Sequence, residues 1–179
     1  MYKIIPVSIL AFTLLFSCNT AKNNIQSSIS INPYQYTSQK KIVADNGAVV
    51  SAHPLASKVG VEMLKMGGNA FDAAIATQFA LAVVYPNAGN LGGGGFTVAR
   101  LSNGELIAID YREKAPGNAT RDMYVDANGT ARTDKSQDGH LASGVPGAVS
   151  GIFSVLKYAK LPLSKLIQPA IDLAEKGFV

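Results

Sequence analysis

The stretch "AFDAAIATQFALAVVY", residues 70–85, decides how this chain folds. It is apolar on nearly every side, dense in alanine, and carries a single charge at Asp72. Such a pattern predicts a helix that is buried on several sides, with small side chains that let neighbouring backbones approach closely. Asn69 is placed to cap the helix, and Asp72 favours its positive N-terminal end. We therefore expect other elements to pack around residues 70–85 on more than one side.

Another helix is predicted just upstream, in "PLASKVGVEMLKMGG", residues 54–68. Leu55, Val59 and Met63 repeat at helical spacing, and Gly67-Gly68 supplies a stop signal. The two helices are separated only by this glycine pair and the Asn69 cap.

Two hairpins are also predicted. Residues 42–53, "IVADNGAVVSAH", favour two short strands around the tight-turn dipeptide Asn46-Gly47. "FTVARL" (residues 96–101) and "ELIAIDYR" (residues 105–112) alternate apolar and polar residues around Ser102-Asn103-Gly104. Helices that precede a hairpin are typical of helices layered on a sheet, so the expected class is α+β.

The C-terminal part begins with a polar, turn-rich segment, residues 117–144. Residues 145–160 and 164–177 then predict two more helices, and Pro169 should kink the second or mark its true start. The chain ends on Phe178-Val179, directly after a glycine that would stop a helix. We expect it to be a piece of a longer protein.

Composition argues for a folded domain and against nucleic-acid binding. The chain has 179 residues, of which 47% are hydrophobic and 16% charged, with a net charge of +4. The basic residues are scattered, and the densest spot is the pair Lys40-Lys41. A nucleic-acid interface needs clustered basic residues on a recognisable element, so we expect none.

The N-terminus reads as an export signal. Lys3 is followed by an apolar run from Ile4 to Phe16, which is short for a membrane span and typical of a signal-peptide core. "LFSC", residues 15–18, resembles a bacterial lipoprotein signal, so we expect residues 1–17 to be removed and Cys18 to be lipidated. An ordinary secretory signal with an incidental cysteine is the alternative. The polar residues 18–40 are expected to form a tether to a domain at 41–179.

Few residues carry the patterns of known chemistry. Gly92–Gly95 lacks the Lys-Ser/Thr of a P-loop, and it follows a helix where a dinucleotide fingerprint would follow a strand. These glycines therefore serve tight packing or line a site. His53 and His140 have no metal-ligand partners at the usual spacing, and no G-x-S-x-G elbow is present, so we expect structural roles for both histidines and no metal.

Arg112 is the strongest candidate for ligand binding. Strand alternation places Leu106, Ala108, Asp110 and Arg112 on one face. An arginine at a strand end can hold a carboxylate through two parallel hydrogen bonds. A surface ion pair with Asp110 or Glu113 is the other possibility, and the alternation alone favours it.

Four blocks in order resemble the N-terminal part of the γ-glutamyltranspeptidases, from about residue 41 to the end. They are residues 46–96, "DYREKAP" at 110–116, "SGVPGAVSG" at 143–151 and "QPAIDLAEKGF" at 168–178. The resemblance implies an N-terminal-nucleophile hydrolase with an αββα sandwich, of which this chain is a portion. It also implies a precursor that cuts itself into two subunits.

The resemblance further implies the reaction. The new N-terminal Thr of the small subunit attacks the γ-glutamyl amide of glutathione or related compounds, and water or an amino acid or peptide accepts the acyl group. No cofactor is expected. Arg112, within "YREKAP", matches the family arginine that binds the α-carboxylate of the glutamyl group. The nucleophile is expected beyond this chain, which alone should be inactive, so none of its threonines is assigned, including Thr97, Thr120, Thr130 and Thr133.

Two alternatives remain at this point. One is an acylase or amidohydrolase of the same superfamily, such as a cephalosporin acylase, although Arg112 favours a glutamyl substrate. The other is a truncated lipoprotein without catalytic activity. In each case we expect export to the periplasm or cell surface.

Overall fold

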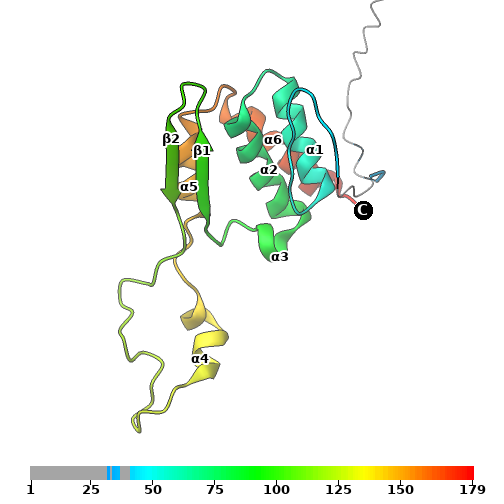
Figure 1. Ribbon diagram of the computed structural model, residues 1–179. Helices are drawn as coiled ribbons and strands as arrows, with labels where there is room; N and C mark the ends of the chain where they lie inside the picture. Colours follow the sequence, from blue (N-terminus) through cyan, green and yellow to red (C-terminus); the bar gives the residue numbers. More distant parts are fainter. Residues whose placement is uncertain (1–31, 33, 37–40) are drawn as a thin grey trace, which may run out of the picture. The chain divides into compact units, whose positions relative to one another are not determined.

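The computed structural model describes residues 32, 34–36 and 41–179 (Figure 1). The predicted signal peptide, Cys18 and most of the predicted tether lie outside these residues. In order, the elements are α1 (Pro54–Lys65), α2 (Ala70–Val84), α3 (Pro86–Gly89), β1 (Phe96–Arg100), β2 (Leu106–Asp110), α4 (Thr133–Gln137), a 3-10 turn η2 (His140–Ala142), α5 (Ala148–Leu156) and α6 (Leu163–Lys176). No helix in this described part has both the length and the apolar character to cross a bilayer.

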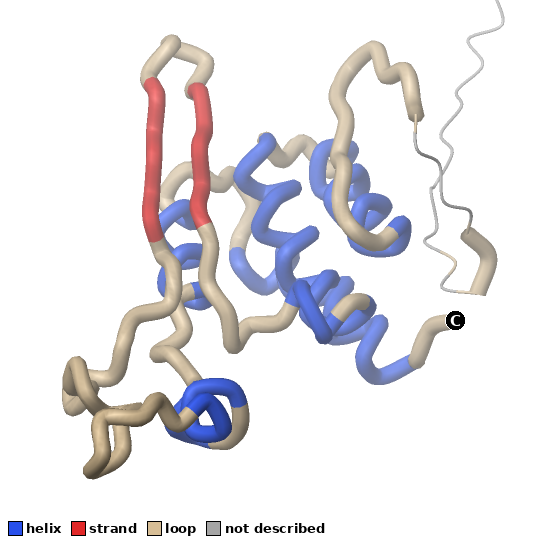
Figure 2. The backbone as a smooth tube through the Cα atoms, turned by 60° about the horizontal axis from the view of Figure 1, so that its bottom comes forward, coloured by secondary structure: helices blue, strands red, loops and turns tan. Residues whose placement is uncertain are grey.

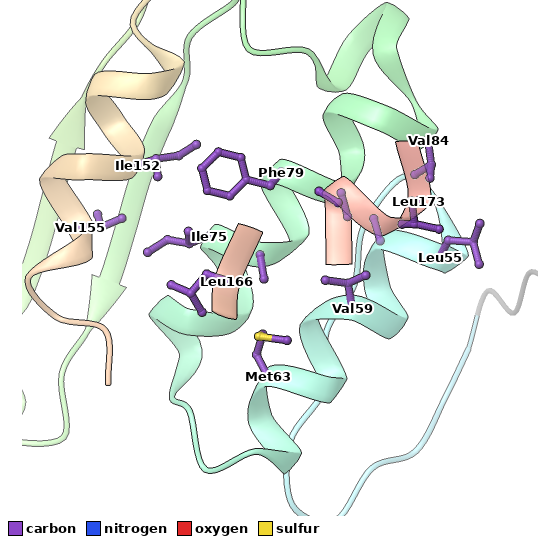
Figure 3. Packing of buried hydrophobic residues seen from close by; sticks show 14 residues of the cluster. Leu55, Val59, Met63, Ile75, Phe79, Val84, Ile152, Val155, Leu166 and Leu173 are labelled. Atoms are coloured by element: carbon purple, nitrogen blue, oxygen red, sulfur yellow. The ribbon is translucent and has the colours of Figure 1, made fainter. Parts of the chain in front are cut away.

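Helix α2 is buried on several sides, as its sequence predicts. Figure 3 shows Ile75 and Phe79 of α2 facing Ile152 of α5, with Val59 and Met63 of α1 on the other side. Helix α6 also packs on α2. The alanines Ala76 and Ala80 are fully buried, because the small side chains let these neighbours approach closely.

The joint between α1 and α2 is fixed by local hydrogen bonds. Gly67 has a φ of 88°, Gly67 N donates to Leu64 O at 3.1 Å, and Gly68 N donates to Met63 O at 3.0 Å. These two bonds form a Schellman motif, which satisfies the last carbonyls of α1. Asn69 then caps α2 by accepting from Phe71 N at 2.8 Å, within a capping box completed by Asp72. The predicted stop and cap are both confirmed.

Asp72 does more than favour the helix end. Its side chain is fully buried, and it accepts from Asn69 N at 2.6 Å, Lys160 N at 3.0 Å and Leu161 N at 2.8 Å. Asn69 adds a bond from its side-chain amide to Tyr158 O at 2.7 Å. The start of α2 is thereby joined to the segment between α5 and α6, which no local pattern predicts.

His53 has the structural role expected of it. It caps α1, because its Nδ1 accepts from Leu55 N at 3.2 Å. Its ring lies 5.3 Å from the ring of Tyr36, centroid to centroid. Burial lowers the pKa of His53 from its ordinary value of 6.5. The neutral ring is therefore the form that caps the helix.

Acidification should weaken this cap. The unfolded chain takes up a proton on His53 at higher pH than the folded chain does, so its stabilising contribution is complete above about pH 6.5 and falls as the pH drops below that value. In the full-length protein, His53→Asn keeps an oxygen acceptor that does not titrate in this range. Between pH 8 and pH 5, the melting temperature of the wild type should fall relative to that of His53→Asn. A constant difference would contradict the capping role.

The predicted hairpin at residues 42–53 is wrong. Neither Asn46 nor Gly47 has the positive φ that a type I′ turn requires. The segment is irregular and lies along α1, where a Cβ on Gly60 would come within 2.7 Å of Val49 Cγ1. Within this stretch Val49 contacts α1, while Ile42, Val43 and Val50 are exposed, and no strand forms there.

The hairpin of β1 and β2 is confirmed (Figure 2, red). The strands pair antiparallel, with Phe96 opposite Asp110 and Arg100 opposite Leu106. Ile109 packs against the core, whereas Phe96, Val98 and Leu106 are exposed. The alternation predicted for β2 therefore holds, with one face of the hairpin turned to the helices and the other left bare by the described residues.

Two further expectations are corrected. Pro169 does not mark the start of its helix, because α6 already begins at Leu163 and continues through the proline. The buried stripe Leu166, Ala170 and Leu173 holds the helix on the core despite the missing N–H. The short helices α3 and α4 lie in segments that the sequence indicates only as loop.

The described part of the predicted tether already contacts the domain. Tyr34 Oη donates to Lys176 O, at the end of α6, at 3.0 Å. Tyr36 packs against the core cluster, and Lys58 Nζ donates to Gln35 O at 3.4 Å. Residues 34–36 therefore belong with the folded domain, although the sequence assigns them to the tether.

Candidate functional site

Arg112 lies two residues beyond the end of β2. Asp110 Oδ1 accepts a hydrogen bond from Arg112 N at 3.0 Å, which satisfies the backbone where strand pairing ends. Asp110 therefore acts on the backbone of Arg112. Charged residues follow the apolar strand here because β2 ends at Asp110, whose carboxylate holds the backbone that follows.

The Arg112 guanidinium is turned to the exposed face of the hairpin. Its Cζ lies 5.9 Å from the centroid of the Phe96 ring, at the edge of cation–π range. Among residues 41–179, no ion pair joins it to Asp110 or Glu113. The surface ion pair favoured by strand alternation is thus not formed. Five N–H donors in a planar fork remain available for a carboxylate.

The glycine run packs directly against the backbone of residues 111–113. A Cβ on Gly94 would lie 2.6 Å from Tyr111 O and 2.8 Å from Arg112 Cα, closer than real Cβ atoms come. Gly93 O accepts from Gly147 N at 3.0 Å and from Ala148 N at 2.9 Å. Tight packing is therefore confirmed for this run, and the place it packs is the site itself.

The start of α5 closes the same segment from another side. Lys114 and Val145 form an isolated antiparallel bridge, with N–O distances of 3.1 and 2.8 Å. A Cβ on Gly147 would collide with Tyr111 O, and one on Gly151 would collide with the Tyr111 ring. Figure 1 shows α5 lying along the hairpin. Three blocks far apart in the sequence, "GGGGF", "DYREKAP" and "SGVPGAVSG", thus meet around Arg112.

Sequence reasoning missed Gly147 and Gly151. The available signal was their spacing: glycines four apart lie on one face of a helix and permit close approach there. The pattern does not say which segment approaches, and only the fold identifies it as Tyr111.

The other candidates lie away from this site or carry no chemistry of their own. His140 begins the 3-10 turn η2. Thr97 donates from Oγ1 to Tyr111 Oη at 3.3 Å, and Thr120, Thr130 and Thr133 are exposed. Within residues 41–179 and the few described before them, no group of three or more His, Cys, Asp or Glu could hold a metal ion. The geometry therefore offers an exposed arginine on a closely packed support.

Comparison with known proteins identifies the family of the chain. Residues 56–179 match the family model described as gamma-glutamyltranspeptidase. The chain is 54% identical over 143 residues to a glutathione hydrolase proenzyme of Pseudomonas sp. (strain A14), covering 79% of this chain and 25% of that protein. It is 43% identical over 152 residues to the acylase ACY 1 proenzyme of Pseudomonas sp. (strain V22), covering 80% and 27%.

The fold agrees as well. The crystal structure of Helicobacter pylori gamma-glutamyltranspeptidase superposes with a TM-score of 0.74 at 53% identity, covering 77% of this chain and 40% of that one. The mixed helices and strands are thus a portion of the N-terminal-nucleophile hydrolase fold. The chain spans about a quarter of the length of the curated relatives it matches. It belongs to the γ-glutamyltranspeptidase family and corresponds to the N-terminal portion of the precursor.

Proposed function

We propose that this chain is the N-terminal portion of a γ-glutamyltransferase/glutathione hydrolase whose Arg112 binds the α-carboxylate of the γ-glutamyl donor. The observation that carries the proposal is the placement of Arg112. Its backbone is secured by Asp110 and by the packed glycines, while no carboxylate of residues 41–179 pairs with its guanidinium. The relatives named glutathione hydrolase proenzyme support the same substrate class.

The rest of the reaction depends on a small subunit made from the same precursor. Its N-terminal Thr supplies the nucleophile, and its own amine serves as the base. The γ-glutamyl group passes to this Thr and then to water or to an amino acid or peptide acceptor. Arg112 holds the donor by the end opposite to the bond that breaks, so it orients the amide for attack.

The test is made on the full-length protein. We expect the purified precursor to convert into two bands on a denaturing gel and then to release the anilide from a γ-glutamyl anilide. Cleavage frees the amine of the N-terminal Thr, which serves as the base, so substrate release should appear only as cleavage proceeds. A precursor that is folded but neither cleaves itself nor releases the anilide would overturn the enzymatic proposal and leave a non-catalytic lipoprotein.

Acylase activity is the second candidate, because the chain also matches a relative named as an acylase. The two activities differ in what the acyl group offers to Arg112. A γ-glutamyl group carries an α-carboxylate, which an arginine fork binds well. Comparing kcat/KM for a γ-glutamyl anilide with that for a cephalosporin side-chain amide would decide between them.

We also propose export to the periplasm or cell surface, with residues 1–17 as the signal and Cys18 as the lipidated residue. The proposal rests on "LFSC" after the apolar run. Cells that express the full-length protein and are fed an alkyne fatty acid should label the wild type. Cys18→Ser should remove the label, and Ser17→Ala should keep it because a small residue remains before the cysteine. Equal labelling of wild type and Cys18→Ser would contradict lipidation at Cys18.

A further inference from the structure

Tyr111, the residue before Arg112, is closely packed by the elements around it. Its ring would touch a Cβ on Gly151 of α5, and its Cε2 lies 3.0 Å from where a Cβ on Gly95 would be. Its hydroxyl donates to Phe96 O and accepts from Thr97 Oγ1, both at 3.3 Å. The ring is thus held at its base by a helix and at its tip by the glycine loop and β1.

The backbone of Tyr111 is held as closely as its ring. Tyr111 N donates to Gly95 O at 3.0 Å, and Tyr111 O accepts from Gly95 N at 3.4 Å. A side chain on Gly94 or Gly147 would collide with Tyr111 O. Glycines from two segments more than fifty positions apart therefore leave room for this single residue.

We propose that Tyr111 is a positioning residue that fixes where the Arg112 guanidinium stands, an inference that rests on the proposed carboxylate-binding role of Arg112. Successive strand residues point to opposite faces, so an inward Tyr111 ring places Arg112 outward. A bidentate arginine works only when its support is held within about 0.5 Å, and a misplacement of about 1 Å can cost about 100-fold in rate. The packed ring of Tyr111 supplies most of that support, since its hydroxyl adds only two long hydrogen bonds of 3.3 Å.

The experiment uses the full-length, self-cleaved enzyme. Tyr111→Ala should raise KM for a γ-glutamyl anilide by about 10- to 100-fold, with the rate of self-cleavage and the KM for the acceptor unchanged. Tyr111→Phe keeps the ring and should restore KM to within about 3-fold of wild type. Gly151→Ala keeps Tyr111 but displaces its ring, so it should raise the donor KM in the same way. Gly117→Ala is the matched control, since nothing lies within 4 Å of its Cβ position, and it should leave KM unchanged.

A double-mutant cycle separates this inference from the proposed function. If Tyr111 acts through Arg112, Tyr111→Ala should have almost no further effect on kcat/KM in an Arg112→Ala enzyme. Equal effects of Tyr111→Ala in both backgrounds would overturn the positioning role while leaving Arg112 as the carboxylate ligand. No loss on Arg112→Ala alone would overturn the proposed function itself. If Tyr111→Ala fails to self-cleave, the same cycle with Gly151→Ala gives the answer.

Discussion

Replacing Arg112 with alanine in the full-length enzyme is expected to lower kcat/KM for γ-glutamyl donors by about 30- to 5,000-fold. This range corresponds to about 2–5 kcal/mol, the cost of removing one partner of a desolvated charge pair. On the exposed hairpin face, the described residues provide one other cation, Arg100, which lies at the opposite end of β1 from Phe96. The donor's α-carboxylate therefore has no substitute for Arg112 beside Phe96 and Asp110, and the loss should be large. Steady-state kinetics with a γ-glutamyl anilide measure it.

Two controls make the result specific. Arg112→Lys keeps the charge but loses the planar fork, so kcat/KM should fall between wild type and Arg112→Ala. Lys114→Ala removes a nearby exposed cation whose structural contact is made by its backbone, so it should change kcat/KM by no more than a few-fold. Equal losses for Lys114→Ala and Arg112→Ala would show that only general charge matters at this site.

Replacing Asp72 with alanine should give the largest loss of stability in this part of the chain. Three backbone N–H groups, of Asn69, Lys160 and Leu161, donate to its buried carboxylate. Removing it leaves these donors without a partner, at a cost of about 3–5 kcal/mol in the free energy of unfolding. Thermal unfolding of the full-length protein should show a lowered melting temperature and a reduced folded yield.

The matched variants for Asp72 differ in what they leave behind. Asp72→Asn has the same size but keeps only one acceptor oxygen, so its loss should be smaller than that of Asp72→Ala. Asp45→Ala removes an exposed carboxylate and should shift stability by no more than about 0.5 kcal/mol. If Asp72→Ala has the same melting temperature as Asp45→Ala, the buried carboxylate does not hold α2 to the segment between α5 and α6.

The elements that local patterns predicted are those whose signals lie within one stretch of chain. Helices α1 and α2 have their spacing, stop and cap in adjacent residues, and β1 and β2 carry alternation on both sides of a turn. The predicted hairpin at 42–53 had a suitable turn dipeptide as well. No hairpin forms because Asn46 and Gly47 lack the positive φ of the turn, and Val49 packs on α1 while Val43 and Val50 stay exposed, so a turn dipeptide alone does not decide strand pairing.

The site shows the same division. Alternation placed Arg112 on the same face as Leu106, Ala108 and Asp110, and its guanidinium lies beside the exposed Phe96 on that side of the hairpin. Alternation could not predict the packing that supports Arg112, because Gly147 and Gly151 contact Tyr111 only once α5 lies against the hairpin. The second partner of Asp72, at residues 160–161, is equally distant in sequence. Contacts between distant segments carry no local signature, so neither could be predicted.

The bare face of the hairpin also has a consequence for solubility. Phe96, Val98 and Leu106 are 63%, 82% and 74% exposed. An apolar strand pair of this kind is a template for pairing with other chains unless something covers it. A folded form of residues 41–179 in which this face stays bare is therefore expected to aggregate, at a rate that rises with protein concentration.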